Sequence, residues 1–120
     1  MNDRDDHLAR FATALEGIET AAGENITRSL EVQRRAGELR ERLESGQPLV
    51  ELIREEQPPL VVELVSANKA TLDTAGAELR AAQALALRAE GLTIEAISEL
   101  FGVTRQRISA LLRQKTATTP

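Results

Sequence analysis

Residues 93–112 read TIEAISELFGVTRQRISALL, and this stretch decides the fold of the C-terminal part of the chain. Ile94, Ile97 and Phe101 recur at helical spacing, so they share one face of a short helix. Gly102 follows where the backbone has to leave that helix in a left-handed conformation, which a residue without a Cβ atom adopts at little cost. The pattern predicts a helix, a sharp turn and a second helix.

Two threonines are placed to cap these helices. The hydroxyl of Thr93 can accept a backbone amide at the start of the first helix, and the hydroxyl of Thr104 can do the same for the second. The apolar residues that are expected to turn toward the first helix are Val103, Ile108, Leu111 and Leu112. We therefore expect the two helices to share one small core.

The opposite side of the second helix is polar and basic. At about 100° per residue, with Ile108 inward, the outward residues are Gln106, Ser109, Ala110 and Arg113, with Arg105 and Arg107 on the flanks. Lys115 adds a further cation, and no acidic residue lies between residues 103 and 120. Such a local positive field suits phosphate groups, which favours DNA as a partner.

The segment FGVTRQRI, residues 101–108, resembles the last conserved region of bacterial primary sigma factors. In those proteins a similar segment opens the helix that reads the upstream promoter element. Resolvase-type recombinases and many small repressors have a similar turn. The resemblance covers about the last third of the chain and implies a helix-turn-helix that binds double-stranded DNA. Nothing resembles the other sigma regions or a recombinase catalytic domain, so neither activity is expected.

The resemblance also implies two kinds of DNA contact. The base-facing positions correspond to Arg105, Gln106, Ser109 and Ala110, and the positions nearer the phosphates to Thr104 and Arg107. The family usually has larger polar residues where this chain has Ser109 and Ala110, and an alanine offers only a methyl contact to thymine. The residues predicted to bind DNA are Thr104, Arg105, Gln106, Arg107, Ser109, Ala110, Arg113 and Lys115.

Composition favours an all-α protein. The 120 residues include 18 alanines and 17 leucines but only two aromatic residues, Phe11 and Phe101. The core therefore has to be built from small and aliphatic side chains, which suit closely packed helices better than a sheet. The length fits one domain, or a small domain with a helical arm.

Several classes of function find no support in the sequence. There is no cysteine, and no apolar run approaches the roughly 20 residues that cross a bilayer. The first ten residues lack an apolar signal core, so we expect a protein of the cytoplasm, at the nucleoid, without a membrane partner. His7 is expected to be a solvated side chain. No catalytic or metal-binding set appears at a suitable spacing, so we expect no enzyme, cofactor or metal.

Charge is divided unevenly along the chain. Residues 1–91 contain 11 basic and 17 acidic residues, a net charge of −6, whereas residues 92–120 contain four and two, a net charge of +2. The acidic part should avoid DNA, which helps to orient the basic C-terminal part toward the duplex.

A heptad-like pattern runs through the N-terminal part. From residue 8 to residue 43, eleven positions advance by three and four residues, and nine of them are apolar. This pattern predicts one helix over residues 5–44 that packs along its length against another helix. In a homodimer, the residues predicted to contact the second chain are Leu8, Phe11, Leu15, Ile18, Ala22, Asn25, Val32, Ala36, Leu39 and Leu43.

Two questions about this seam stay open. Asn25 and Ser29 interrupt it, either to fix the register by hydrogen bonding across a helix pair or because Ile26 and Leu30 continue the apolar stripe there. The second question is the partner helix. It belongs to another chain, or the long helix folds back on residues 60–89 of its own chain, and such hairpins can themselves pair into a dimer.

Glycines and prolines mark the remaining boundaries. The sequence SGQP at residues 45–48 is expected to end the long helix, with Pro48 as the first residue of a short helix that stops before Pro58. Helical spacing then continues from residue 60 to Gly91, with an interruption expected near residues 66–71. The predicted domains are a dimerising arm and connector over residues 1–70, a DNA-binding head over 71–115 and a disordered tail over 116–120.

Together, these features predict a small homodimeric transcriptional regulator that reads the major groove through the helix of residues 104–115. Two heads are expected because one head with about four phosphate contacts binds weakly at physiological salt. One alternative is an architectural or nucleoid-associated protein with little sequence preference. Another is a protein-interaction module that contacts RNA polymerase or another protein. In the simplest alternative, the C-terminal helices only pack and the arginines are merely solvated.

Overall fold

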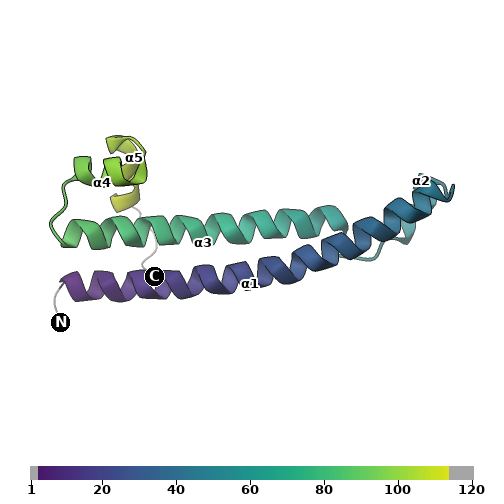
Figure 1. Cartoon of the computed structure of the whole chain (residues 1–120), viewed down its shortest axis with the longest axis horizontal. Coiled ribbons are helices and arrows are strands. Elements are labelled where there is room, and N and C mark those ends of the chain that lie inside the picture. The colour runs from purple at the N-terminus through teal and green to yellow at the C-terminus, as the bar shows by residue number, and fades with distance from the viewer. Residues whose placement is uncertain (1–2, 114–120) are drawn as a thin grey trace. The chain divides into compact units, whose positions relative to one another are not determined.

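The computed structural model describes residues 3–113, and this part of the chain contains helices, turns and connections but no strand. The all-α fold expected from the composition is therefore confirmed. Figure 1 shows the helices in chain order, and their bounds are α1 (Asp3–Glu44), α2 (Leu49–Glu55), α3 (Val61–Ala89), α4 (Ile94–Phe101) and α5 (Arg105–Arg113). None of these helices combines the length and the apolar character that a membrane span requires.

The chain divides into two compact units, to which α1 and α3 each contribute a segment. Of the described residues, 20–73 form what we call the hairpin unit, with α2 and the adjoining parts of α1 and α3. Residues 3–19 and 74–113 form the head unit, which holds α4 and α5.

In the hairpin unit, α1 folds back along α3 of the same chain. The guanidinium of Arg28 donates to Thr71 Oγ1 at 3.4 Å, and seven residues later Arg35 donates to the carbonyl of Pro59. As the numbers rise along α1, its partners move back from Thr71 of α3 to the segment just before α3, which defines an antiparallel pair. The sequence left open whether the long helix packs on another chain or on its own chain. Within this unit, it packs on α3 of its own chain.

A polar network bridges the two helices at the centre of the hairpin unit. The amide of Asn68 donates to Ser29 Oγ at 3.2 Å, and Ser29 Oγ in turn donates to Asn25 Oδ1 at 3.4 Å. Of the two interpretations of Asn25 and Ser29, the structure therefore supports hydrogen bonding across a helix pair. Ile26 and Leu30 do not continue the inward stripe, since they are 62 % and 61 % exposed.

The inward face of α1 follows the predicted seam at six of its eleven positions. Half-buried residues of that seam include Phe11, Ile18, Asn25, Val32 and Leu39, whereas Leu8, Leu15, Ala22, Ala36 and Leu43 are exposed. A second inward row lies one position before Leu15, Ala22, Ser29, Ala36 and Leu43, and it contains Ala14, Ala21, Arg28, Arg35 and Arg42. Long arginine stems can cover apolar surface while their charged ends reach polar partners. A prediction based only on the spacing of apolar residues therefore missed this row.

The connection from α1 to α2 follows the sequence expectation closely. Gly46, with φ of 96°, ends α1, and the amide of Gln47 donates to the carbonyl of Arg42 at 3.1 Å, which completes a Schellman cap. Pro48 is the N-cap of α2 and not its first residue, because its backbone is extended. The buried residue of α2 is Leu52, at 1 % exposure.

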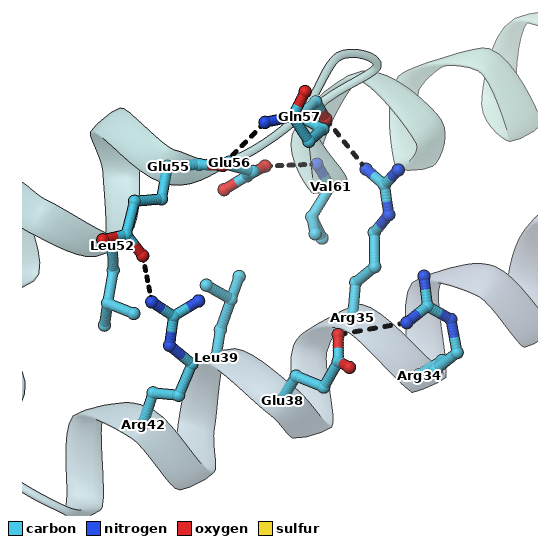
Figure 2. Close-up of a pocket in the computed structure, with 10 residues that line it drawn as sticks. All are labelled: Arg34, Arg35, Glu38, Leu39, Arg42, Leu52, Glu55, Glu56, Gln57 and Val61. Carbon is cyan, nitrogen blue, oxygen red and sulfur yellow. Dashed lines mark hydrogen bonds and ion pairs between the residues drawn. The ribbon is translucent and has the colours of Figure 1, made fainter.

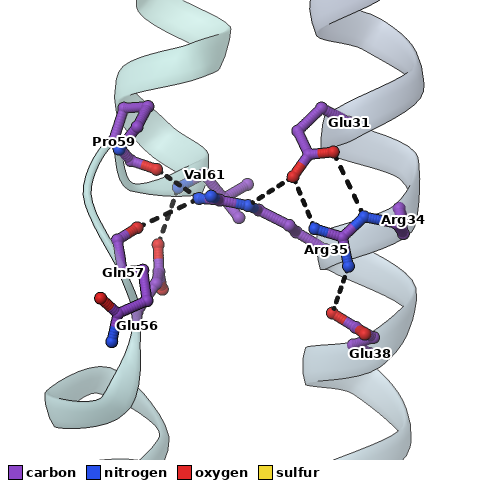
Figure 3. Close-up of polar contacts among 8 residues, drawn as sticks. All are labelled: Glu31, Arg34, Arg35, Glu38, Glu56, Gln57, Pro59 and Val61. Atoms are coloured by element: carbon purple, nitrogen blue, oxygen red, sulfur yellow. Dashed lines mark hydrogen bonds and ion pairs between the residues drawn. The ribbon is translucent and has the colours of Figure 1, made fainter.

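Arginines of α1 hold the segment between α2 and α3. The guanidinium of Arg35 donates to the carbonyls of Gln57, at 3.1 Å, and Pro59, on either side of a cis peptide bond. Figure 3 shows this side chain reaching from α1 to the connector, and Figure 2 shows Arg42 paired with Glu55 of α2 in the same region. These contacts tie both α2 and the connector, the segment between α2 and α3, to α1.

Arg35 and its neighbour Arg34 are paired with a carboxylate of α1. Glu31 accepts hydrogen bonds from Arg34 at 2.6 Å and from Arg35 at 2.8 Å. The hydrogen bond from Arg34 lowers the pKa of Glu31 below its ordinary value, and the hydrogen bond from Glu31 raises the pKa of Arg34. The guanidinium of Arg35 is therefore oriented by its own helix before it meets the connector (Figure 3).

The interruption expected near residues 66–71 is absent, because α3 runs through this segment without a break. The hydroxyl of Ser66 donates to the carbonyl of Val62 at 3.0 Å, so it bonds within the helix and does not divert the backbone. Lys69 and Asp73 form an ion pair one turn apart at 2.6 Å. A segment with polar side chains therefore stays helical.

Candidate nucleic-acid interface

The head unit is built on a small aliphatic core. Its centre consists of Ala84 of α3, Ile97 of α4 and Ile108 with Leu111 of α5, all at most 2 % exposed. Partly buried side chains packed around this centre are Leu87, Leu92, Ile94, Phe101 and Leu112. The shared core that the spacing of Ile97 and Ile108 predicted is thus confirmed, and the C-terminal segment of α3 completes it (Figure 1).

The first turns of α4 and α5 are capped as the sequence indicated. The hydroxyl of Thr93 accepts the amide of Ala96 at 3.1 Å, and the hydroxyl of Thr104 accepts the amide of Arg107 at 3.1 Å. Each threonine thereby satisfies an amide that has no partner inside its helix. The hydroxyl of Thr104 serves α5 itself, so it is not a freely rotating group at the surface.

Gly102 supplies the sharp turn between α4 and α5. Its φ and ψ of 66° and 34° lie in the left-handed region, and the amide of Val103 donates to the carbonyl of Ser98 at 3.1 Å. Gly91 has a φ of 102° and ends α3 in the same way. One expectation for this segment is wrong, because Val103 is 39 % exposed and lies in the turn instead of the core.

The outward side of α5 faces a broad, open groove of about 570 Å³. Four of the predicted DNA-binding residues line it together, and the complete lining is Ile94, Arg105, Gln106, Ser109 and Arg113. The participation of Ile94 was not predicted, since its apolar character assigned it only to the core. Its place at the first residue of α4, beside α5, is a tertiary feature.

The other predicted DNA-binding residues lie elsewhere. Arg107 is exposed and Ala110 is half-buried, and neither lines the groove. Lys115, like the tail expected over residues 116–120, lies outside the described residues. The structure thus gathers Arg105, Gln106, Ser109 and Arg113 on one side of α5 and leaves Arg107 and Ala110 on the other.

Two of the cations on α5, Arg105 and Arg107, have no carboxylate partner among the described residues. Within residues 3–113, Arg105 and Arg107 form no ion pair, although two carboxylates, Glu95 and Glu99, lie on the neighbouring α4. In contrast, four arginines of α1 each pair with a carboxylate one turn away on the same helix, as in Arg40 with Glu44 at 3.2 Å. Unpaired guanidinium groups on an exposed helix suit phosphate oxygens.

A second hollow in the protein is lined by equal numbers of positive and negative side chains. It has a volume of about 190 Å³, lies between α1, α2 and the connector, and contains three arginines and three glutamates among its lining residues (Figure 2). Since these charges pair with one another or with the backbone, the hollow offers no net field to a ligand. Among the residues that the structure describes, no cluster of histidine, aspartate or glutamate could hold a metal ion.

Comparison with known proteins agrees with the geometry of the head. Residues 75–116 match a family described as a homeodomain-like domain. The match begins inside α3 and spans α4 and α5, which are the three helices that share the core around Ile97. Neither the curated proteins nor the solved structures gave a match. The C-terminal part of this chain is therefore a helix-turn-helix domain, which supports a DNA-binding protein.

Proposed function

We propose that this protein is a small homodimeric transcriptional regulator that binds double-stranded DNA and reads the major groove with α5. The observation that carries the proposal is the groove that collects Arg105, Gln106, Ser109 and Arg113 on the side of α5 away from Ile108. Helix-turn-helix domains place such a side against base edges. The finer resemblance of FGVTRQRI to the sigma factor region agrees with this assignment.

The side chains divide by chemistry into readers and anchors. Gln106 can bond an adenine edge with two hydrogen bonds, and an arginine such as Arg105 or Arg113 can do the same for guanine. Arg107, on the opposite flank, is an anchor for phosphate. Ser109 can accept or donate a single hydrogen bond, so it contributes less to the distinction between bases.

Dimerisation supports this function through affinity. A single head with about four phosphate contacts binds weakly at physiological salt, whereas two linked heads gain from effective concentration. Two heads related by a two-fold axis would recognise half-sites about one helical turn apart, or a multiple of one turn. The hairpin described above pairs α1 with α3 within one chain, so we assign the dimer to a pairing of hairpins.

The first test is selection of bound fragments from a random duplex library at about 0.15 M salt, followed by sequencing. We expect a two-fold motif. Gln106→Ala and Arg113→Ala should each weaken binding to that motif about 5- to 150-fold, the range of 1–3 kcal/mol per bidentate contact, with unchanged helicity. Arg40→Ala is the matched control, because Arg40 is an exposed arginine of the hairpin unit. Full affinity in both head variants would refute the assigned face.

A second candidate function is architectural binding with little sequence preference. It is favoured by the exposed, unpaired Arg105 and Arg107 and by the half-buried Ala110, since arginines serve phosphates well and alanine reads bases poorly. Enrichment of fragments without a motif in the same selection would support it. No enrichment at all would instead favour the third function, contact with RNA polymerase or another protein.

A further inference from the structure

The hairpin unit exposes an apolar surface that its own fold does not cover. Ile26 and Leu30 of α1 are 62 % and 61 % exposed, and Val62 and Val65 of α3 are 68 % and 52 % exposed. Single exposed apolar residues are ordinary, but four on neighbouring helices of one small unit form a patch that indicates an interaction site.

Three of these residues, Ile26, Leu30 and Val65, line an open groove between α1 and α3. The groove has a volume of about 530 Å³, and its lining residues are Asn25, Ile26, Ser29, Leu30, Val32, Gln33, Val65 and Asn68. Its floor is the polar network in which Asn68 donates to Ser29. Because these polar groups already have partners within the chain, covering the groove would not leave them without hydrogen bonds.

The α1 side of this groove carries no charge over more than four helical turns. Positions 22, 23, 26, 29, 30, 33, 36 and 37 fall within one sector of the helix, about 140° wide at 100° per residue, and hold only alanine, glycine, isoleucine, serine, leucine and glutamine. The charged residues of the same stretch, such as Glu24, Glu31 and Arg34, lie on other sides of α1. A neutral face meets no like-charge repulsion from a copy of itself.

Within the same sector, the sizes of the side chains are also arranged symmetrically about a point between Ser29 and Leu30. Residues equally distant from that point are Ala22 with Gly37, Gly23 with Ala36, and Ile26 with Gln33. A Cβ atom built on Gly23 or Gly37 would meet nothing within 4 Å, so the fold of the single chain gives no reason for a glycine there. A glycine inside a helix costs about 1 kcal/mol relative to alanine, and close approach of a second helix would explain it.

We infer that this face is the homodimer interface, in which α1 of one copy lies antiparallel to α1 of a second copy across a two-fold axis near Ser29 and Leu30. A two-fold interface uses the same surface on both partners, which is the property that the symmetric pattern provides. In this arrangement, Ile26 and Leu30 of each copy fill the groove of the other.

The size of the surface agrees with a dimer. Residues 22–37 of α1 span about 24 Å at 1.5 Å per residue, and two helices side by side are about 20 Å wide, so each copy presents a footprint of about 500 Å². Two footprints reach the roughly 1,000 Å² that a specific interface needs. We therefore expect a dimer that dissociates on dilution, with Lys69 and Asp73, a paired and exposed couple, at its rim.

This interface is the contact surface of the homodimer proposed above. It rests on the proposed function only in its consequence, which is that dimerisation joins two DNA-binding heads. Its test is sedimentation of the full chain between about 1 and 100 µM. We expect the wild type to be dimeric at the upper end, and Leu30→Glu to weaken dimerisation at least about 100-fold, because the two-fold axis buries two unpaired carboxylates. Leu49→Glu is the matched control, since Leu49 is 58 % exposed on α2 and does not line the groove.

A cross-linking measurement tests the same interface without an added charge. The chain contains no cysteine, so Leu30→Cys introduces a single exposed thiol beside the two-fold axis, where we expect a disulfide-linked dimer under oxidation. Thr27→Cys, exposed on another side of α1, should remain largely unlinked. This readout stays valid if Leu30→Glu perturbs folding, which circular dichroism would detect.

Three results would overturn the inference: a wild type that stays monomeric at 100 µM, a folded Leu30→Glu variant that dimerises like the wild type, and equal cross-linking of the two cysteine variants. DNA affinity is measured separately. A dimer that fits the interface but binds no duplex at low salt would refute the proposed function and leave the interface standing. A monomeric Leu30→Glu variant that still binds duplex weakly, through one head, would leave both standing.

Discussion

The turn between α4 and α5 provides the sharpest single test of the head. Gly102 adopts a φ of 66° and ψ of 34°, and a Cβ atom built on it would meet nothing within 4 Å. The effect of Gly102→Ala is therefore set by backbone conformation and not by a steric clash. The left-handed conformation costs an L-residue about 1–2 kcal/mol, and the lower entropy of the unfolded chain returns about 0.4–1 kcal/mol. The net expectation is a loss of about 1 kcal/mol.

The matched control is the same substitution in a helix. Gly17 of α1 has equally open surroundings, but it is helical, so Gly17→Ala should stabilise the protein by about 1 kcal/mol. Amide hydrogen exchange of α4 and α5 is the assay, because it reports local opening of the head. We expect Gly102→Ala to accelerate exchange there about fivefold, as 1 kcal/mol implies. Exchange that is unchanged or slower in this variant would refute the argument from the backbone angles.

Three further substitutions test other parts of the argument. Ile108→Ala removes a fully buried side chain from a very small core, so it should destabilise the head by about 2–5 kcal/mol and abolish DNA binding, measurable by thermal unfolding and a binding titration. Arg107→Gln should lower the slope of log affinity against log salt by about 0.9 if the arginine neutralises one phosphate, and an unchanged slope would remove Arg107 from the interface. Glu31→Gln tests the lowered pKa of that carboxyl, which stabilises the folded state above the ordinary pKa of 4.5 and loses this effect as the pH falls through the lowered value. Urea unfolding should therefore find the wild type slightly more stable than this variant at pH 7 and equally stable near pH 2.

The head could be predicted well from the sequence because its determinants are local. Thr93, Gly102 and Thr104 act on backbone groups within three or four residues, and the spacing of Ile97 and Ile108 defines the inward sides of two short helices. No knowledge of distant contacts is needed to read such features. The exposure of Val103 escaped this reasoning, because a residue in a turn has no helical face to which its side chain can be assigned.

The long helix shows the limit of the same reasoning. The sequence determined that α1 is a continuous amphipathic helix, since apolar residues recur at intervals of three and four over its length. It did not determine which of two adjacent rows faces the partner. The tertiary structure decided this, because Arg28, Arg35 and Arg42 extend along the seam to reach polar groups of α3, α2 and the connector.

What the sequence by itself determined, then, is the all-α class, the helix ends at glycines and threonines, and the polar, basic outer side of α5. These follow from backbone conformation and from helical periodicity, which act over a few residues. Only the tertiary structure decided that α1 pairs with α3 of its own chain within the hairpin unit, that Ile94 joins the groove beside α5, and that Ile26 and Leu30 are left exposed. The physical reason is that the choice among apolar faces depends on which polar side chains find partners on another segment, and spacing along one helix carries no information about that segment.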